Sequence, residues 1–188
     1  MAKQNQSYEQ LWQEVLQNDR QAFEKIYKHF YPNLFSYARK LIRDENQAQD
    51  AIQSTFLYLW IHRQQIGVIQ SVRFYLFKSI RSSCLKLIQK QKRLKTLEEV
   101  NDQLRLIQSP EELNLVDDSQ KVKQQLKKAL LDLSPRQQEI IYLKFYNNLD
   151  YEEIGDVLNI NYQSVVNHVY RAIQKLREHK TLQFFRNF

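Results

Sequence analysis

The stretch YEEIGDVLNINYQSVVNHVYRAIQKLRE, residues 151–178, decides the fold that this chain is expected to adopt. Two helical patterns, residues 151–158 and 162–178, are separated only by Asn159, Ile160 and Asn161. A turn of this length between two short helices is typical of a helix-turn-helix. Asn159 tolerates the left-handed backbone that such a turn needs, and Asn161 is a favourable N-cap for the second helix. Gly155 would let the two helices approach closely.

The second of these helices has two chemically different faces at about 100° per residue. Its apolar face is made of Val165, Val169, Ala172, Ile173 and Leu176. Its polar face carries Gln163, Asn167, Tyr170, Arg171 and Gln174, with Ser164 and His168 on the flank. Amide side chains can bond adenine through two hydrogen bonds, and arginine can bond guanine or phosphate.

The residues that reach base edges lie near the N-terminus of a recognition helix. The predicted DNA-binding residues of this helix are therefore Gln163, Ser164, Asn167, His168 and Arg171. The alternative interpretation is the solvated polar face of an ordinary helical hairpin, which the spacing alone does not exclude.

Residues before the helix-turn-helix carry further signals for the start of a helix, and these extend the predicted domain to four helices. Ser134 and Gln137 have N-cap and N3 chemistry around Pro135, and Asp150 with Glu153 repeats the pattern. With Lys121 as its first residue, the domain is predicted to have helices at about 121–132, 135–147, 151–158 and 162–178.

The N-terminal half also reads as helices. The predicted elements are Tyr8 to Leu16, a run from Asp19 through Lys40 in which Pro32 marks a break or kink, Glu45 to Gln64 after an Asp44 N-cap, and Val72 to Arg93. Cys84, the single cysteine, is expected to be a small buried residue of the last helix, so no intrachain disulfide is possible.

Composition supports an all-α fold of two small helical domains. The 188 residues include only 2 Gly and 3 Pro, too few for an all-β fold with many tight turns. The predicted domains are residues 8–93 and 121–180, joined by a linker over residues 94–120. No apolar run at the N-terminus resembles a signal peptide, and none approaches the ~20 residues of a membrane span. A cytoplasmic protein is expected.

The formal net charge of +7 is unevenly distributed. Residues 1–93 carry 15 basic and 7 acidic residues, residues 94–120 carry 2 and 7, and residues 121–188 carry 11 and 7. Two basic blocks flanking an acidic connector indicate a polyanionic partner, with nucleic acid the first candidate and an anionic membrane surface the second. The alternative is a basic protein whose charge has no specific partner.

One basic block combines positive charge with aromatic residues. Between Ala51 and Leu97 there is no acidic residue and there are nine basic ones. Such a field suits phosphates, and neighbouring aromatic rings can stack on unpaired bases. The alternative for Phe74 and Phe77 is a place in the core, which we favour for Phe77. The nucleic-acid candidates here are Arg73, Tyr75, Lys78, Arg81 and Lys86.

Two long stretches resemble one family. Residues 126–178, LKKALLDLSPRQQEIIYLKFYNNLDYEEIGDVLNINYQSVVNHVYRAIQKLRE, closely resemble region 4 of bacterial sigma factors. Residues 22–63, AFEKIYKHFYPNLFSYARKLIRDENQAQDAIQSTFLYLWIHR, resemble sigma region 2, and residues 74–93 resemble its basic end. The order of the two regions, with a short linker and no third globular region, is that of the extracytoplasmic-function (ECF) subfamily of the sigma-70 family.

The resemblance implies a transcription initiation factor. In this family, region 2 docks on a coiled coil of the polymerase beta-prime subunit and melts and captures the minus-ten element. Region 4 docks on the beta flap and reads the minus-thirty-five element. The positions that match the docking pattern of the family are Asp50, Gln53 and Phe56. An anti-sigma factor is a further partner that the family admits, although no residue here identifies one.

Some positions depart from the family pattern. Ser54 stands where an acidic residue is usual after Gln53, which puts the strength of polymerase docking in doubt. Ser82 and Lys86 replace a common Asn and Asp, and Val166 and His168 replace common basic residues, which puts the usual promoter sequence in doubt. The acidic linker is either a polyanion mimic in a nucleic-acid channel or a plain solvated tether.

Other classes of function remain open at this point. No metal-ligand spacing, glycine-rich phosphate loop or Cys/His pair indicates an enzyme, a cofactor or a metal site. A stand-alone DNA-binding regulator would use residues 121–188 to bind promoters without polymerase. An RNA-binding adaptor is favoured only by the basic blocks.

Overall fold

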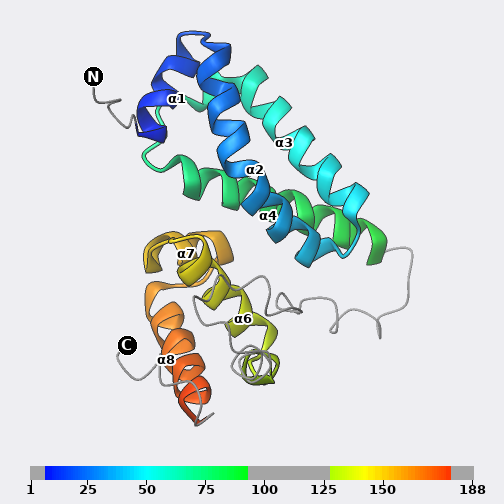
Figure 1. Cartoon of the computed structure of the whole chain (residues 1–188), viewed down its shortest axis with the longest axis vertical. Helices are drawn as coiled ribbons and strands as arrows, with labels where there is room; N and C mark the ends of the chain where they lie inside the picture. Colours follow the sequence, from blue (N-terminus) through cyan, green and yellow to red (C-terminus); the bar gives the residue numbers. More distant parts are fainter. Residues whose placement is uncertain (1–6, 93–127, 179–188) are drawn as a thin grey trace, which may run out of the picture. The chain divides into compact units, whose positions relative to one another are not determined.

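The computed structural model describes residues 7–92 and 128–178, and all regular elements in these ranges are helices. The chain divides into two compact units, Met1–Leu97 and Glu98–Phe188 (Figure 1). This architecture confirms the predicted all-α class. The predicted linker and the predicted helical start at residues 121–127 lie outside the described residues.

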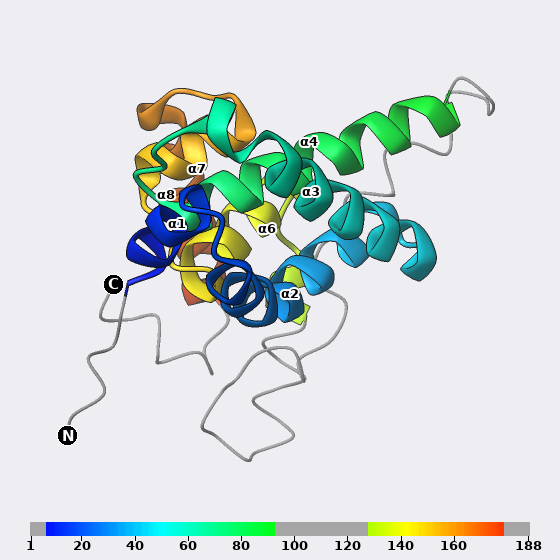
Figure 2. The ribbon, with the colours of Figure 1, turned by 90° about the horizontal axis from the view of Figure 1, so that it is seen from above.

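The first unit is built from α1 (Tyr8–Leu16), α2 (Arg20–Ile42), α3 (Glu45–Ile66) and α4 (Val72–Lys92). Helix α2 packs against the other three, and α3 packs against α4 (Figures 1 and 2). The predicted first helix has the observed bounds, and α3 runs two residues beyond the predicted end. Helix α2 continues through Pro32, which therefore does not break it.

Local capping explains why these helices begin where the sequence predicts. The Asp19 carboxylate accepts hydrogen bonds from the amides of Gln21 (2.7 Å) and Ala22 (3.1 Å). The Asp44 carboxylate accepts one from the amide of Gln47 at 2.9 Å. Each bond satisfies a backbone donor that has no partner within the first turn of its helix.

The loop between α3 and α4 is held by α1. The indole Nε1 of Trp12, a residue only 1% exposed, donates to the carbonyl oxygen of Gly67 at 2.8 Å. The Glu9 carboxylate accepts a hydrogen bond from the amide of Val72 at 3.3 Å. These two contacts fix both ends of the loop and hence the start of α4.

The core of the first unit contains residues from all four helices, among them Leu34, Ile52, Ile80 and Cys84. Phe77 is 1% exposed, which confirms its predicted place in the core, whereas Phe74 is half-buried. Lys40 is also buried, and this burial, together with the neighbouring charge of Arg39, lowers the pKa of its ammonium group to about 8.

The second unit comprises a helical segment at residues 128–131, then α6 (Pro135–Ile141), the π-helical turn η4 (Tyr142–Tyr146), α7 (Tyr151–Leu158) and α8 (Tyr162–Glu178). The buried Gln138 amide joins the first two, donating to the carbonyl oxygens of Leu130 (2.9 Å) and Leu133 (3.2 Å). Helix α8 packs against both α6 and α7.

The prediction of one helix over residues 135–147 is wrong in its second half. After Ile141 the backbone widens into η4, and its carbonyl oxygens bond to groups farther along the chain than in an α-helix. The Asn147 side chain donates to the Tyr142 carbonyl oxygen at 3.3 Å. The Leu149 amide donates to the Leu143 carbonyl oxygen at 3.2 Å. Burial of Asn147 and Leu149 fixes this arrangement.

Candidate nucleic-acid and protein interfaces

The turn between α7 and α8 has the predicted geometry. Asn159 is left-handed, with φ 54° and ψ 51°. The Asn161 side-chain oxygen accepts a hydrogen bond from the Ser164 amide at 2.8 Å, which caps α8 as predicted. A Cβ on Gly155 would stand 2.8 Å from the carbonyl oxygen of Ile160, so the close approach at this glycine is confirmed. The atom nearest to that Cβ thus belongs to the backbone of the turn.

Helix α8 presents the two faces that the sequence predicts. Val165, Val169, Ala172 and Leu176 are buried, and Ile173, predicted on the same face, is half-buried. The exposed residues on the other side include Gln163, Asn167, Tyr170 and Arg171, while Ser164 and His168 are half-buried on the flank. The Gln163 Nε2 donates to the Asn167 Oδ1 at 3.3 Å, so the two candidate base-reading amides are linked. Of the predicted set, the most accessible are therefore Gln163, Asn167 and Arg171.

The electrostatic setting of His168 favours its neutral form. Burial lowers the pKa of the imidazole, and the positive charges of Arg136 and Arg171 lower it further. The Arg136 guanidinium also lies 3.6 Å from the Glu139 carboxylate. Two guanidinium groups, Arg136 from α6 and Arg171 from α8, thus disfavour the charged form of this histidine.

A groove of about 600 Å³ runs between α3 and α4. Three of the predicted nucleic-acid residues, Tyr75, Lys78 and Lys86, line it. The other lining residues are Ser54, Thr55, Tyr58, Leu59, Ser79, Ser82 and Ser83. Burial and then the nearby Tyr58 raise the pKa of Tyr75. The groove therefore combines aromatic rings, hydroxyl groups and ammonium groups, which suits a nucleic-acid strand.

The other two predicted residues of α4 do not line this groove. Arg73 lies near Tyr8 and His29, and its positive charge contributes to lowering the pKa of the His29 imidazole after the larger effect of burial. Arg81 is half-buried away from the groove. Tyr58, which comes from α3 and is 55% exposed, was not among the predicted residues. The available signal was its position one turn before Ile61 and His62, which are also exposed or half-buried.

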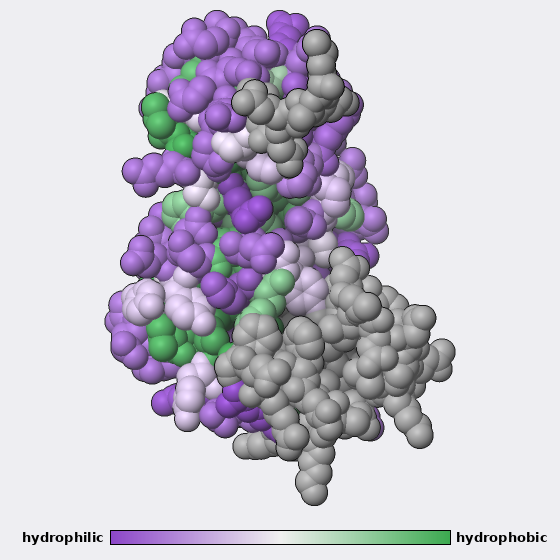
Figure 3. All heavy atoms as spheres, turned by 60° about the vertical axis from the view of Figure 1, so that its left-hand side comes forward, coloured by the Kyte–Doolittle hydropathy of each residue, from purple (hydrophilic) through white to green (hydrophobic). Residues whose placement is uncertain are grey.

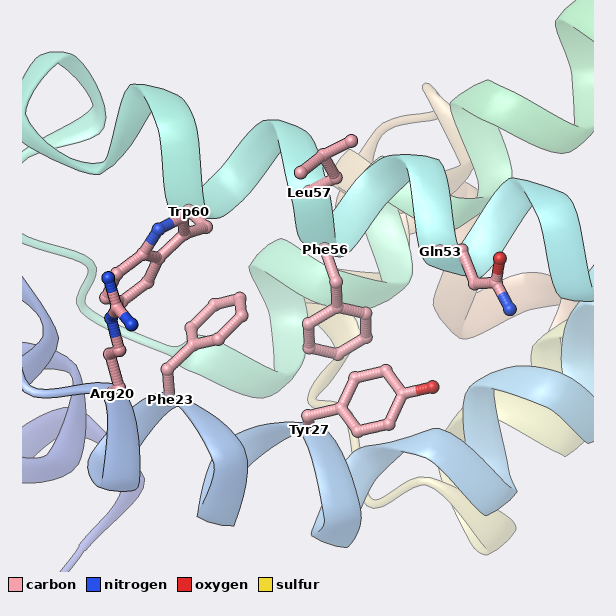
Figure 4. Close-up of a pocket in the computed structure, with 7 residues that line it drawn as sticks. All are labelled: Arg20, Phe23, Tyr27, Gln53, Phe56, Leu57 and Trp60. Atoms are coloured by element: carbon pink, nitrogen blue, oxygen red, sulfur yellow. The ribbon is translucent and has the colours of Figure 1, made fainter.

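A second, apolar groove of about 430 Å³ lies between α2 and α3. Its lining residues are Arg20, Phe23, Tyr27, Gln53, Phe56, Leu57 and Trp60 (Figure 4). The rings of Phe23 and Tyr27 rise from α2 toward Phe56, with centroid separations of 5.9 and 4.9 Å. We call Phe23, Tyr27 and Trp60 the aromatic row. Gln53 lies near one end of it, and Arg20 lies beside Trp60 at the other end (Figure 4).

The predicted polymerase-docking residues have different exposures. Asp50 and Gln53 are exposed, one turn apart on α3. Phe56 is only 3% exposed, so it forms the floor of the apolar groove and offers little surface of its own. Phe23, Tyr27 and Trp60 were not among the predicted site residues. Their spacing of three to four residues on each helix was the available sign of a shared aromatic row.

Most of the described surface seen in Figure 3 is hydrophilic, with separate hydrophobic areas. Within residues 7–92 and 128–178, no three His, Cys, Asp or Glu side chains gather in a way that could hold a metal ion. None of the helices described there combines the length and the apolar character needed to cross a membrane.

Comparison with known proteins identifies both units. The sigma-70 region 2 family matches residues 26–94, and the sigma-70 region 4 family matches residues 123–176. The ECF RNA polymerase sigma factor SigM of Bacillus subtilis (strain 168) is 22% identical over 160 residues, covering 82% of this chain and 92% of that protein. The RNA polymerase sigma factor SigV of the same strain is 22% identical over 148 residues, covering 79% and 82%.

Solved structures share the fold. CnrH in complex with the cytosolic domain of CnrY matches with a TM-score of 0.59 at 17% identity, over 90% of this chain and 94% of that chain. The sigma factor RpoE in complex with the anti-sigma factor NepR from Bartonella quintana matches with a TM-score of 0.59 at 22% identity, over 85% and 97%. With regions 2 and 4 matched in order along one chain, the protein belongs to the ECF subfamily of the sigma-70 family.

Proposed function

We propose that this protein binds core RNA polymerase, directs it to specific promoters and promotes DNA melting for transcription initiation. The observation that carries the proposal is the pair of sigma regions in order, the second of which presents exposed amide and guanidinium groups on α8. A recognition helix that follows a tight turn places such groups in the major groove. Helix α8 would read the minus-thirty-five element.

The groove between α3 and α4 is proposed to take the melted minus-ten strand. Exposed Lys78 and Lys86 would contact phosphates, and the rings of Tyr58 and Tyr75 would stack on unpaired bases. Because base stacking needs bases out of the duplex, this surface favours single-stranded over double-stranded DNA. Arg73 and Arg81, which lie away from the groove, would contact flanking phosphates.

The polymerase contact is proposed on α3. The exposed Asp50 carboxylate and Gln53 amide can hydrogen-bond a helix of the beta-prime coiled coil, and the aromatic row beside Gln53 offers an apolar surface for the same partner. Phe56 supports that surface from below. The second unit would dock on the beta flap. CnrH and RpoE were solved with CnrY and the anti-sigma factor NepR, so an anti-sigma factor is proposed as a regulatory partner here too.

Co-migration with bacterial core RNA polymerase in size-exclusion chromatography tests the proposal. The wild-type chain is expected to elute with the polymerase at low salt. The Asp50→Ala/Gln53→Ala double variant is expected to elute alone while keeping its helical circular dichroism, because both side chains are exposed. The matched control is Gln65→Ala, an exposed residue near the other end of α3, which should co-migrate as the wild type does.

A folded chain that fails to join the polymerase at low salt would contradict the proposal. A free helix-turn-helix regulator would then be the leading account, and promoter binding without polymerase would be its signature. A double variant that still co-migrates would place the docking surface elsewhere on the first unit.

A further inference from the structure

We infer that α8 reads two neighbouring adenines through the hydrogen-bonded amides of Gln163 and Asn167, with no guanine contact from its first two turns. This inference deepens the proposed function, since it rests on α8 being the promoter-reading helix. It assigns the base specificity of that helix.

The two amides are positioned together before any DNA is present. Gln163 and Asn167 are exposed, lie one turn apart in the N-terminal half of α8, and are joined by the 3.3 Å bond from the Gln163 Nε2 to the Asn167 Oδ1. The N-terminal part of a recognition helix is the part that reaches base edges. Each amide therefore limits the rotation of the other on the surface that would enter the groove.

The hydrogen-bonding capacity of the pair matches two adenines. Bidentate recognition of adenine needs one acceptor for the N6 amino group and one donor for N7. Gln163 keeps its Oε1 and the second hydrogen of its Nε2 after bonding Asn167. Asn167 keeps its Nδ2 hydrogens and the second lone pair of its Oδ1. Both residues can thus read an adenine while the bond between them stays formed.

The same part of the helix lacks the two side chains that most often read guanine. Arginine and lysine make the commonest specific contacts to guanine, and none occurs from Tyr162 to Tyr170. His168 is half-buried on the flank of α8, outside the exposed face that carries the two amides. Arg171 is the first guanidinium on α8, more than two turns from the start, where phosphate is the simpler partner.

One exposed aromatic ring supports an A·T-selective surface. Tyr170 is 64% exposed and lies two turns after Gln163, on the same face of α8. Aromatic carbon packs well on the C5-methyl group of thymine, which each A·T pair also presents in the major groove. This ring can therefore add discrimination for the base pairs that the amides read. Tyr162 lies elsewhere, because its ring packs edge-on against Tyr151 of α7.

The test is selection of the upstream promoter element from a randomised duplex library by the full chain bound to core polymerase. We expect the wild-type holoenzyme to enrich adenine at two neighbouring positions. Gln163→Ala should relax one of them and Asn167→Ala the other, with about a five- to hundred-fold loss of discrimination at each. Arg171→Ala is the comparison, and should weaken binding to all sequences with a shallower salt dependence.

A substitution and a base analogue give sharper readouts. Gln163→Arg should convert the preference at its position from adenine to guanine, because arginine bonds O6 and N7 of guanine. Replacing the enriched adenine with 7-deazaadenine removes the N7 acceptor and should weaken wild-type binding. The same replacement should have little further effect on the alanine variant that reads that position, since the two changes remove the same bond.

The outcomes separate this inference from the proposed function. Enrichment of guanine by the wild type, or alanine variants that keep the wild-type preference, would overturn the adenine assignment and leave the sigma-factor role in place. A chain that joins core polymerase but enriches no upstream element would overturn both. Circular dichroism of each variant checks that a changed preference does not reflect an unfolded second unit.

Discussion

Gly155 and Ile160 are bound to each other through their backbones. The Ile160 amide donates to the Gly155 carbonyl oxygen at 2.9 Å, and the Ile160 carbonyl oxygen lies 2.8 Å from where a Cβ on residue 155 would stand. Any side chain at position 155 must therefore push the turn that positions α8.

The substitution Gly155→Ala tests that contact directly. Alanine would gain about 1 kcal/mol of intrinsic helix propensity, but the clash with backbone that cannot rotate away should outweigh it. An overpacking cost of about 1–3 kcal/mol less that gain leaves a net loss of up to about 2 kcal/mol in the free energy of unfolding of the second unit, and we also expect weaker promoter binding. Denaturation followed by circular dichroism measures it. Glu152→Ala, an exposed change on α7, is the control; a more stable Gly155→Ala chain would contradict the contact.

Substitutions at Phe56 and Gln53 should have separate effects, the first on stability and the second on polymerase binding. Phe56 is buried under the aromatic row, so Phe56→Ala should leave a cavity and lower the free energy of unfolding of the first unit by about 3–5 kcal/mol. Gln53→Ala removes an exposed amide and should leave stability unchanged while weakening polymerase binding. Thermal unfolding and co-migration measure the two effects. An equally stable Phe56→Ala chain that no longer binds polymerase would make Phe56 a direct contact.

The buried Lys40 predicts a stability change at alkaline pH. Its folded-state pKa of about 8 lies below the unfolded value of 10.5, so the unfolded state binds more protons between these values. Wild-type stability relative to Lys40→Met should therefore rise with pH across this interval, by up to about 3 kcal/mol, and stay constant below pH 8. Urea unfolding at several pH values measures it. Lys25→Met, which removes an exposed ammonium group from the same helix, is the matched control.

The surroundings of His168 predict that promoter affinity depends on pH. Its pKa in the free chain is lowered by burial, Arg136 and Arg171, and phosphates in a complex would raise it. Binding would then take up a proton, so affinity should increase as pH falls through the interval between the two pKa values. His168→Gln should remove that dependence. Fluorescence anisotropy on promoter DNA from pH 8 to pH 5.5 measures the affinity. If the affinities of the wild type and of His168→Gln change with pH in parallel, His168 is not the titrating group.

Capping chemistry was predictable from the sequence because it is local. Asp44 and Asn161 each satisfy an amide three residues away, so their effect depends only on neighbouring residues. The π-helical turn was not predictable in this way. Nothing in the apolar spacing of residues 142–146 distinguishes it from an α-helix, and it depends on how Asn147 and Leu149 are buried.

The nucleic-acid candidates of α4 show a different limit. The basic residues form one continuous field along the sequence, but about 100° of rotation per residue distributes them around the helix. Lys78 and Lys86 therefore reach the groove, while Arg73 turns toward His29. The aromatic row was missed because it needs the register of α2 against α3, which is a property of packing.

The two tryptophans lie in very different surroundings, and this makes the chain its own fluorescent reporter. Trp12 is sealed in the core and bonded to Gly67, whereas Trp60 lines the apolar groove under the Arg63 guanidinium, 4.3 Å from the ring centroid. Because the sequence contains only these 2 tryptophans, both in the first unit, their emission follows that unit alone. Replacing Trp12 with phenylalanine would leave one fluorophore beside the surface where a protein partner is expected.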